Sequence, residues 1–385
     1  MIQVLHTIYI TYSLRSIKRY NELFKILTKN SNEVGQPFYP KGNEIYETNY
    51  LSSKGFTRII LRKTKIKKKY RQPYTSIEIQ LNPKRLICKD NKIKIMKDKD
   101  IAAVNKKFNS IIKSIDMFLP GFYQWTLKRV DYATYIKTPF VNEYIELFNQ
   151  GDRPARFRPL LKYDKTKHRS VPPKGSFYLI SNGANINFYN KQAERINKYM
   201  YSYDDIDDKE LEDAKDILRF EVQCEKDKTN YLKKKYKFKT KELYNFLNLD
   251  VSRETIEYYY KHSIRTGDYY TYAKAIDIIN NSNHSIRLKN SLIKTLKLIN
   301  LKNGIYEARK LFIQGIEFYI NSKEKVFLKG TKKTFNNHLK LFDELGINPV
   351  TIERRANIIK KLKELGNEKL INPINEILNN MRGND

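Results

Sequence analysis

The segment SFYLISNGANINFYN, residues 176–190, decides the fold class because it holds two strand-like runs joined by a turn. Apolar and polar residues alternate in each run, as they do in a strand with one buried face. Asn182-Gly183 between the runs favours a tight hairpin turn, since both residues tolerate positive φ. The segment therefore predicts an antiparallel hairpin, and the residues that follow, KQAER (191–195), favour a helix.

Further strand-like and helical patterns surround this hairpin. The strand-like segments are Met1–Tyr12, Gly55–Lys63, Tyr74–Leu81, Trp125–Ile136 and Ile217–Glu225. Helical spacing of apolar residues occurs between them and dominates the chain after about residue 226. The pattern predicts an α+β protein, with a central, mainly antiparallel sheet backed by helices in residues 1–231 and a mostly helical domain in residues 232–385.

The chain is strongly basic. Its 385 residues include 74 Lys and Arg against 42 Asp and Glu, which gives a formal net charge of +32. Such an excess favours a polyanionic partner, either nucleic acid or an anionic membrane surface. Lys, Asn, Ile and Tyr are all abundant, as in proteins from A/T-rich genomes, so compositional drift is the alternative explanation. We favour nucleic acid, because the imbalance exceeds what solubility requires.

Membrane insertion and disulfide bonding are not expected. No run of about 18 apolar residues occurs, and the first residues lack the basic start of a signal peptide. Cys88 and Cys224, the two cysteines, lie in strand-like apolar surroundings and are expected to be reduced core residues. These features predict a cytoplasmic protein.

Several strands place polar side chains on one face. Residues two apart in a strand share a face, so Tyr189 and Lys191 lie opposite Phe188, and Arg219 and Glu221 lie opposite Phe220. If the strands pair into one sheet, its polar face gathers the following residues: Glu78, Asp131, Tyr189, Lys191, Arg219 and Glu221.

This set could perform phosphoryl transfer. Clustered carboxylates of Glu78, Asp131 and Glu221 would repel one another unless a divalent cation, Mg²⁺ or Mn²⁺, offset their charge. The hydroxyl of Tyr189 could then attack phosphorus, while Lys191 favours the phenolate or binds a phosphate oxygen. A structural explanation exists for each feature. Any one of 29 tyrosines is more often a packing residue than a nucleophile, and a polar strand face is usually solvated.

Four blocks of sequence resemble the rolling-circle replication initiators of filamentous phages and plasmids, of the phage gene II protein type. The blocks are SIEIQLNPKRL (76–86), KRVDYATY (128–135), INFYNKQAER (186–195) and ILRFEVQCEKDKTNYLKKKY (217–236). They occur in the family's order and at similar spacing, and they cover the core of the N-terminal two-thirds of the chain. The C-terminal region matches only loosely.

The resemblance implies an origin-specific single-strand endonuclease and ligase that leaves a 3′-hydroxyl primer. Tyr189 matches the family's nucleophile. The other matching positions are Lys191 and Glu194 in the same block, Arg219 and Glu221 in the R-F-E block, Asp131, and Glu78 before the Asn-Pro turn. Origin DNA, a host helicase and a polymerase are the implied partners.

One feature departs from many rolling-circle nucleases, which hold their metal with a His-hydrophobic-His pair. The five histidines here are isolated: His6, His168, His262, His284 and His338. Carboxylates are therefore expected to supply most metal ligands. A second tyrosine is not identified, because Tyr199, Tyr201 and Tyr203 follow the strand instead of lying on its face.

Three basic segments are expected to contact DNA phosphates. The candidate residues are Lys67, Lys68, Lys69, Arg153, Arg156, Arg158, Lys233, Lys234 and Lys235. Nearby aromatic residues that could stack on unpaired bases are Phe157, Tyr163, Tyr236 and Phe238. Each segment alone is more often a solvated loop.

The segment 334–362 predicts helix, tight turn, helix, which we interpret as a helical hairpin in preference to a DNA-reading helix-turn-helix. Two other classes compete with the initiator. One is a non-catalytic DNA-binding regulator of copy number or partition, and the other is a tyrosine recombinase, whose Arg/His set we do not find. The sequence leaves the origin and the oligomeric state open.

Overall fold

The computed structural model describes residues 5–42, 44–64, 74–88, 95–164, 169–171, 175–202, 207–321, 324–352 and 356–381. The described residues form a large antiparallel sheet with helices, followed by a mostly helical C-terminal region. The predicted α+β class is therefore confirmed.

The large sheet has ten strands, and each hydrogen-bonded neighbour runs antiparallel to the next. Their spatial order is β2 (Tyr39–Gly42), β3 (Ile45–Thr48), β4 (Phe56–Lys63), β5 (Thr75–Leu81), β1 (Leu5–Ser13), β6 (Thr126–Lys137), β12 (Ile217–Cys224), β11 (Ala184–Asn190), β10 (Ser176–Ile180) and β7 (Arg158–Pro159). The predicted hairpin is present as β10 and β11, with Phe177 opposite Phe188. Segments far apart in the chain, β1, β6 and β12, thus meet at the centre.

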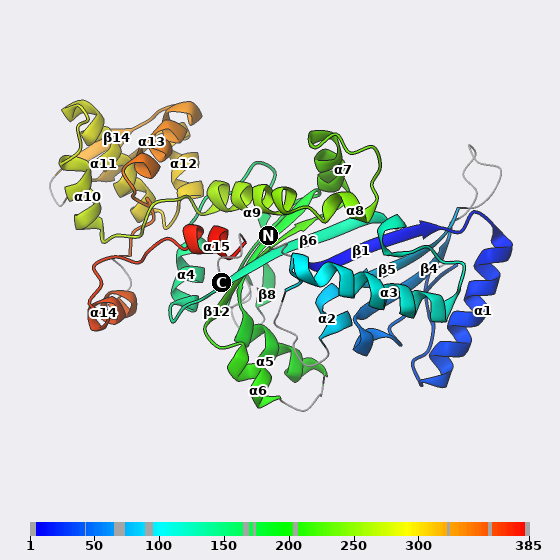
Figure 1. The fold of residues 1–385 in the computed structure, drawn as a ribbon. Helices are drawn as coiled ribbons and strands as arrows, with labels where there is room; N and C mark the ends of the chain where they lie inside the picture. The colour runs from blue at the N-terminus through cyan, green and yellow to red at the C-terminus, as the bar shows by residue number, and fades with distance from the viewer. Residues whose placement is uncertain are drawn as a thin grey trace.

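One face of this sheet is apolar. Phe188 of β11 and Phe220 of β12 are opposite each other in register and stack with ring centroids 4.1 Å apart. Tyr260 of α9 (Leu249–Ser263) meets both rings edge-on, at 5.7 and 5.8 Å. Figure 1 shows α9 lying across this part of the sheet. Burying each such aromatic ring stabilises the fold by about 1.5–3 kcal/mol.

The other half of the apolar face packs on α3 (Ile101–Ile115). Phe108 of this helix stacks on Phe56 of β4 at 5.4 Å and meets Trp125 edge-on at 5.9 Å. The remaining helices before α9 are α1 (Ile17–Glu33), α2 (Pro83–Ile87), α4 (Val141–Phe148), α5 (Lys191–Ser202), α6 (Asp208–Asp213), α7 (Lys226–Lys235) and α8 (Leu243–Phe246). Helices from both halves of the chain therefore share one core.

Beyond α9 the chain is mainly helical, as predicted. The elements are α10 (Tyr272–Asn280), α11 (Ile286–Leu301), α12 (Ile305–Gln314), α13 (Lys332–Glu344), α14 (Ala356–Glu364) and α15 (Ile374–Asn380). Two short hairpins, β13 (Ile316–Tyr319) with β14 (Lys325–Leu328) and β8 (Lys162–Asp164) with β9 (Arg169–Val171), lie outside the large sheet. Figure 1 shows α10 to α13 grouped at the end of the molecule opposite α1.

The predicted helical pair in segment 334–362 is not formed. A stretch of chain, 345–355, too long for a tight turn separates α13 from α14, and Figure 1 places α14 well away from α13. Lys361 of α14 instead donates to Glu143 of α4 at 3.0 Å. The pattern misled because apolar spacing predicts each helix but not which element buries its face.

The predicted domain boundary at 231/232 falls inside α7. C-terminal residues also return to the sheet: the Asn380 side chain donates to the backbone carbonyl of Tyr135 at 3.0 Å. The division into two domains stays a prediction.

Neither cysteine forms a disulfide, and Cys224 is buried while Cys88 is half-buried. In the part of the chain that the structure describes, no helix is long and apolar enough to cross a membrane.

Candidate active site

Tyr189 lies near the end of β11 on the polar face of the sheet. It is opposite Arg219 in the β11–β12 register, and its neighbour Phe188 points into the core on the other face. The Tyr189 hydroxyl donates a 2.6 Å hydrogen bond to Oε1 of Glu221. The tyrosine is 8% exposed, so this bond is largely shielded from solvent.

The environment of this pair favours a protonated tyrosine beside an ionised carboxylate. Burial, reinforced by the charge of Glu221, raises the pKa of Tyr189 well above its ordinary value. Burial opposes ionisation of Glu221, but the charges of Arg219 and Lys191 and the hydrogen bond from the Tyr189 hydroxyl favour it, and the pKa of Glu221 lies below its ordinary value. The geometry therefore pairs a hydroxyl that carries its proton with a group able to accept it.

Two buried cations flank the pair. Nη1 of Arg219 lies 3.8 Å from Oε1 of Glu221, and the arginine is fully buried. Nζ of Lys191 lies 5.7 Å from the centre of the Tyr189 ring and donates to Glu194 at 2.8 Å. Burial, together with the charge of Arg219, lowers the pKa of Lys191 to about 8.

Lys191 lies beside Tyr189, as predicted, but it belongs to a helix and not to the strand. The strand ends at Asn190, and Lys191 is the first residue of α5. The Asn190 side chain accepts a hydrogen bond from the Ala193 backbone N–H at 3.1 Å, which caps the first turn of that helix. Lys191 is therefore not on the strand face, although its side chain lies beside Tyr189.

His6 joins the site and was missed from the sequence. Its Nδ1 lies 3.5 Å from Oε1 of Glu221, and burial lowers its pKa to about 4, so the imidazole is neutral at pH 7. Strict alternation would place His6 on the apolar face with Ile8. The pairing of β1 with β6 shifts between Leu5 and Thr7, and the extra residue at this bulge is His6.

The predicted carboxylate cluster is not formed among the described residues. Asp131 accepts two hydrogen bonds from Arg129, both 2.7 Å long. Glu78 accepts hydrogen bonds from the Tyr9 hydroxyl, from Lys128 at 2.8 Å and from Arg62 at 3.2 Å. Other side chains thus neutralise both carboxylates.

Position along the strands separates Glu78 from the other two. On β1, Thr11 is opposite Glu78 whereas Thr7 is opposite Asp131, so the two carboxylates are offset by four positions, about 13 Å, along the strand direction. Among the residues that the structure describes, no three His, Cys, Asp or Glu side chains are placed to share a metal ion. Glu78, Asp131 and Glu221 therefore do not fit one Mg²⁺ or Mn²⁺ site in this arrangement.

The predicted DNA contacts are scattered. Lys67, Lys68 and Lys69 lie outside the described residues. The others take these positions: Arg153 and Arg156 line a pocket of about 760 Å³, Arg158 is exposed on β7, Lys233 is half-buried and Lys234 exposed on α7, and Lys235 forms an ion pair with Glu254. None of the six described residues of this set lies beside Tyr189 in the sheet.

Two of the predicted base-stacking aromatics are engaged elsewhere. Tyr236 and Phe238 stack on each other with ring centroids 5.6 Å apart, and Phe238 also packs edge-on against Phe246. The side chain of Tyr163 lies outside the described residues. Phe157 lines a pocket together with residues of α7 and α9.

The tyrosines that follow Tyr189 are not part of its site. Tyr199 of α5 donates to Glu210 of α6 at 2.6 Å, and Arg195 lies 3.1 Å from the same carboxylate. The side chains of Tyr201 and Tyr203 lie outside the described residues. Tyr199 therefore provides a matched control for Tyr189.

Comparisons with known proteins do not identify a family for this chain. No family model matches the chain, and no curated protein matches it either. Among solved structures, the chain is similar to one entitled "Structure of Rolling Circle Replication Initiator Protein from Geobacillus stearothermophilus". The identity is 12%, and the match covers 67% of this chain and 84% of that chain at a TM-score of 0.29. A likeness that weak carries no argument, so the function must be inferred from the side chains around Tyr189.

Proposed function

We propose that this chain nicks and rejoins DNA to initiate rolling-circle replication, with Tyr189 as the nucleophile. One observation carries the proposal: the buried Tyr189 hydroxyl donates to the Glu221 carboxylate at 2.6 Å, with Arg219 and Lys191 alongside. A nucleophile within hydrogen-bond reach of a base, with cations where charge develops, is the arrangement that covalent phosphoryl transfer needs.

The proposed step exchanges one phosphate ester for another. The Tyr189 oxygen forms a bond to phosphorus as the bond from phosphorus to the 3′ oxygen breaks. The tyrosine proton passes to Glu221, and the departing 3′ oxygen takes up a proton to become a free hydroxyl. The products are a 5′-phosphotyrosine and a 3′-OH primer, and reversal of the step rejoins the strand.

The two cations have separate parts in this step. Arg219 lies close enough to Glu221 to keep it ionised, and its planar guanidinium suits a phosphate oxygen. Lys191, with its pKa lowered to about 8, is charged at pH 7 yet close to the range in which it can release a proton. It can therefore stabilise charge on the phosphate or supply the proton that the 3′ oxygen needs.

The wider setting remains as predicted from the sequence. We propose that the protein acts in the cytoplasm on single-stranded origin DNA and works with a host helicase and polymerase. Dependence on Mg²⁺ or Mn²⁺ is also a prediction, and comparing nicking in either metal with nicking in EDTA tests it.

A covalent adduct is the decisive observation. Protein incubated with single-stranded origin DNA labelled at its 3′ end, with Mg²⁺ or Mn²⁺, should carry label through denaturing electrophoresis, because the fragment joined to Tyr189 keeps the original 3′ end. The adduct should disappear in Tyr189→Phe and persist in Tyr199→Phe. An adduct retained by Tyr189→Phe would contradict the assignment of the nucleophile.

A non-catalytic DNA-binding regulator is the second candidate. It is favoured by a basic pocket of about 760 Å³ that Tyr189 does not line, and that could bind nucleic acid without any chemistry. Binding to DNA with no adduct under either metal would support this candidate.

A further inference from the structure

Two pockets adjoin on either side of one loop. Pro154, Ala155 and Phe157 line both of them. The smaller pocket, of about 360 Å³, is completed by α7 and α9, and the larger, of about 760 Å³, by α12 and α13. The loop between α4 and β7 thus joins them into one groove.

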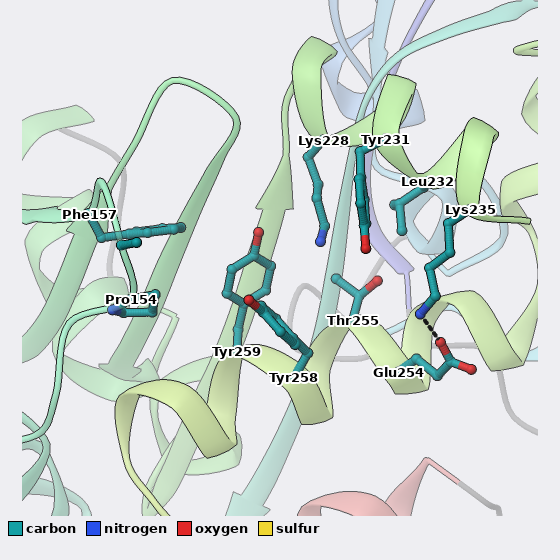
Figure 2. A pocket seen from close by; sticks show the side chains of 11 residues that line it. Pro154, Phe157, Lys228, Tyr231, Leu232, Lys235, Glu254, Thr255, Tyr258 and Tyr259 are labelled. Atoms are coloured by element: carbon teal, nitrogen blue, oxygen red, sulfur yellow. Dashed lines mark hydrogen bonds and ion pairs between the residues drawn. The ribbon is translucent and has the colours of Figure 1, made fainter. Parts of the chain in front are cut away.

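The smaller pocket is lined with aromatic rings. Lys228 of α7 places Nζ 4.7 Å from the ring centre of Tyr231, 5.3 Å from that of Tyr258 and 4.8 Å from that of Tyr259. Phe157 meets Tyr259 edge-on at 5.6 Å from the opposite wall. Figure 2 shows these side chains converging on one space, Lys228 and Tyr231 from α7 and the other two tyrosines from α9.

Two of these rings are open to solvent, whereas Tyr259 is 6% exposed. Tyr231 is 55% exposed and Tyr258 48% exposed. Exposed aromatic faces beside a cation, within a hollow, are suited to stacking on unpaired bases, whereas bases stacked inside a duplex cannot reach them.

The larger pocket is strongly basic. Its lining has seven Arg and Lys side chains and one carboxylate, Asp152. Arg309 makes hydrogen bonds of 2.5 and 2.7 Å to Asp152, and Arg265 pairs with Asp343. The other five have no acidic partner within the described ranges: Arg153, Arg156, Lys310, Lys332 and Lys340.

The uncompensated charge is accessible. Lys310, Lys332 and Lys340 are exposed and come from two helices, α12 and α13. Arg153 is held over the Tyr306 ring, 4.2 Å from its centre, which orients its guanidinium in the pocket wall. Such a surface complements a run of phosphates.

We propose that the two pockets form one groove for single-stranded DNA, with bases against Phe157, Tyr258 and Tyr231 and phosphates in the basic pocket. The inference rests on the proposed function, because a protein that nicks one strand of an origin has single-stranded DNA to hold. It goes beyond that function by assigning the strand to residues of α7, α9, α12 and α13 that are remote from the chemistry.

The distance from Tyr189 follows from the sheet register. Tyr189 is opposite Arg219, whereas α7 begins just after Cys224, which is opposite Ala184 at the other end of the pair. Five residues along a strand correspond to about 17 Å. Substitutions in the groove should therefore change the affinity for DNA and leave the bond-forming step intact.

Fluorescence anisotropy with a labelled oligothymidine tests the basic pocket. Lys310, Lys332 and Lys340 are replaced together by Ala, and the control replaces three exposed lysines elsewhere, Lys54, Lys106 and Lys107. The pocket variant should reduce the slope of log affinity against log salt by about 2, since each phosphate contact on a single strand contributes about 0.7. Equal losses in the two variants would overturn the assignment.

The aromatic pocket is tested with Tyr258→Ala and Phe157→Leu. Each should weaken binding of the single strand roughly tenfold, the effect of losing one stacked base, and leave duplex affinity unchanged. Unchanged melting temperatures would exclude unfolding as the cause. If both variants bind the oligothymidine as tightly as the parent, or lose duplex affinity equally, the groove does not hold unpaired bases.

Binding is measured on Tyr189→Phe in EDTA, so that the result is independent of nicking. Tight, groove-dependent binding with no adduct in the parent protein would reject the proposed function and support the groove. An adduct formed through Tyr189 without groove-dependent binding would support the proposed function and reject the groove.

Discussion

The sheet carries two tyrosine–glutamate pairs, and their differences show what distinguishes a reactive pair from a structural one. In each, a tyrosine hydroxyl donates to a buried glutamate flanked by cations: Tyr189 to Glu221, and Tyr9 to Glu78. Glu78 also accepts from Lys128 and Arg62, at 2.8 and 3.2 Å, and both cations are about one-third exposed.

Around Glu221 the cations are buried and more distant. Arg219 is fully buried with Nη1 3.8 Å away, and the buried Lys191 bonds Glu194 instead. A carboxylate already bonded closely by two cations is a poor base, whereas one held ionised from a distance can still accept a proton. We therefore expect reactivity at Tyr189 and a structural role at Tyr9.

The sharpest way to break this comparison is to remove each hydroxyl. Tyr189→Phe should reduce adduct formation below detection, because the substitution removes the hydroxyl that attacks phosphorus. Tyr9→Phe should leave the rate within roughly a factor of 3 of the parent. Quantifying labelled adduct over time measures both rates. A severe loss in Tyr9→Phe would contradict the structural role of Tyr9.

Exchanging each carboxylate for an amide should separate catalysis from stability. Glu221→Gln should slow adduct formation about 10²- to 10⁴-fold, the usual contribution of a positioned base. Glu78→Gln should mainly lower the free energy of unfolding, by about 1–3 kcal/mol, as Lys128 and Arg62 lose their charged partner. Single-turnover nicking and denaturant unfolding provide the two measurements, and the reverse pattern would contradict the roles.

The charge of Lys191 should set the alkaline limit of the reaction. Its pKa is lowered from 10.5 to about 8, so the ammonium is present below pH 8 and is lost as pH rises above it. Adduct formation should therefore fall roughly tenfold per pH unit above that value. In Lys191→Arg the guanidinium stays charged, and the decline should move upward by more than one pH unit. A pH–rate profile identical in both proteins would exclude Lys191 as the titrating group.

His6 should have the smallest effect. At pH 7 it is neutral, and its Nδ1 lies 3.5 Å from Oε1 of Glu221 and 3.1 Å from the Thr7 hydroxyl, so it is next to the carboxylate without contributing charge. His6→Ala should slow adduct formation roughly threefold to tenfold, as expected for the loss of one neutral polar neighbour. A loss as large as that of Glu221→Gln would make His6 a direct participant.

Alternation along strands was enough to predict part of this site. It placed Tyr189, Arg219 and Glu221 on one face, because β11 and β12 are regular over these residues. It could not place Glu78, since alternation predicts the face of a side chain but not how far along the sheet it lies. The offset of about 13 Å along the strands between Glu78 and Asp131 depends on register, which is set by tertiary pairing.

Local irregularity explains the remaining differences. A bulge in β1 turns His6 to the polar face, and the end of β11 at Asn190 transfers Lys191 to a helix. Neither event has a strong signature in the residues themselves. The groove was less predictable still, because Phe157, Tyr258 and Lys340 come from segments that meet only in the folded chain.

The stacked rings of Phe188 and Phe220 have a consequence for any attempt to redesign this protein. They lie 4.1 Å apart on the face opposite the site, and each is the chain neighbour of a residue in it, Tyr189 or Glu221. A slip of one residue between β11 and β12 would turn Tyr189 into the core. The alignment of donor and acceptor is thus maintained by a hydrophobic contact behind them. Core variants chosen only for stability should accordingly be screened for the fidelity of strand transfer.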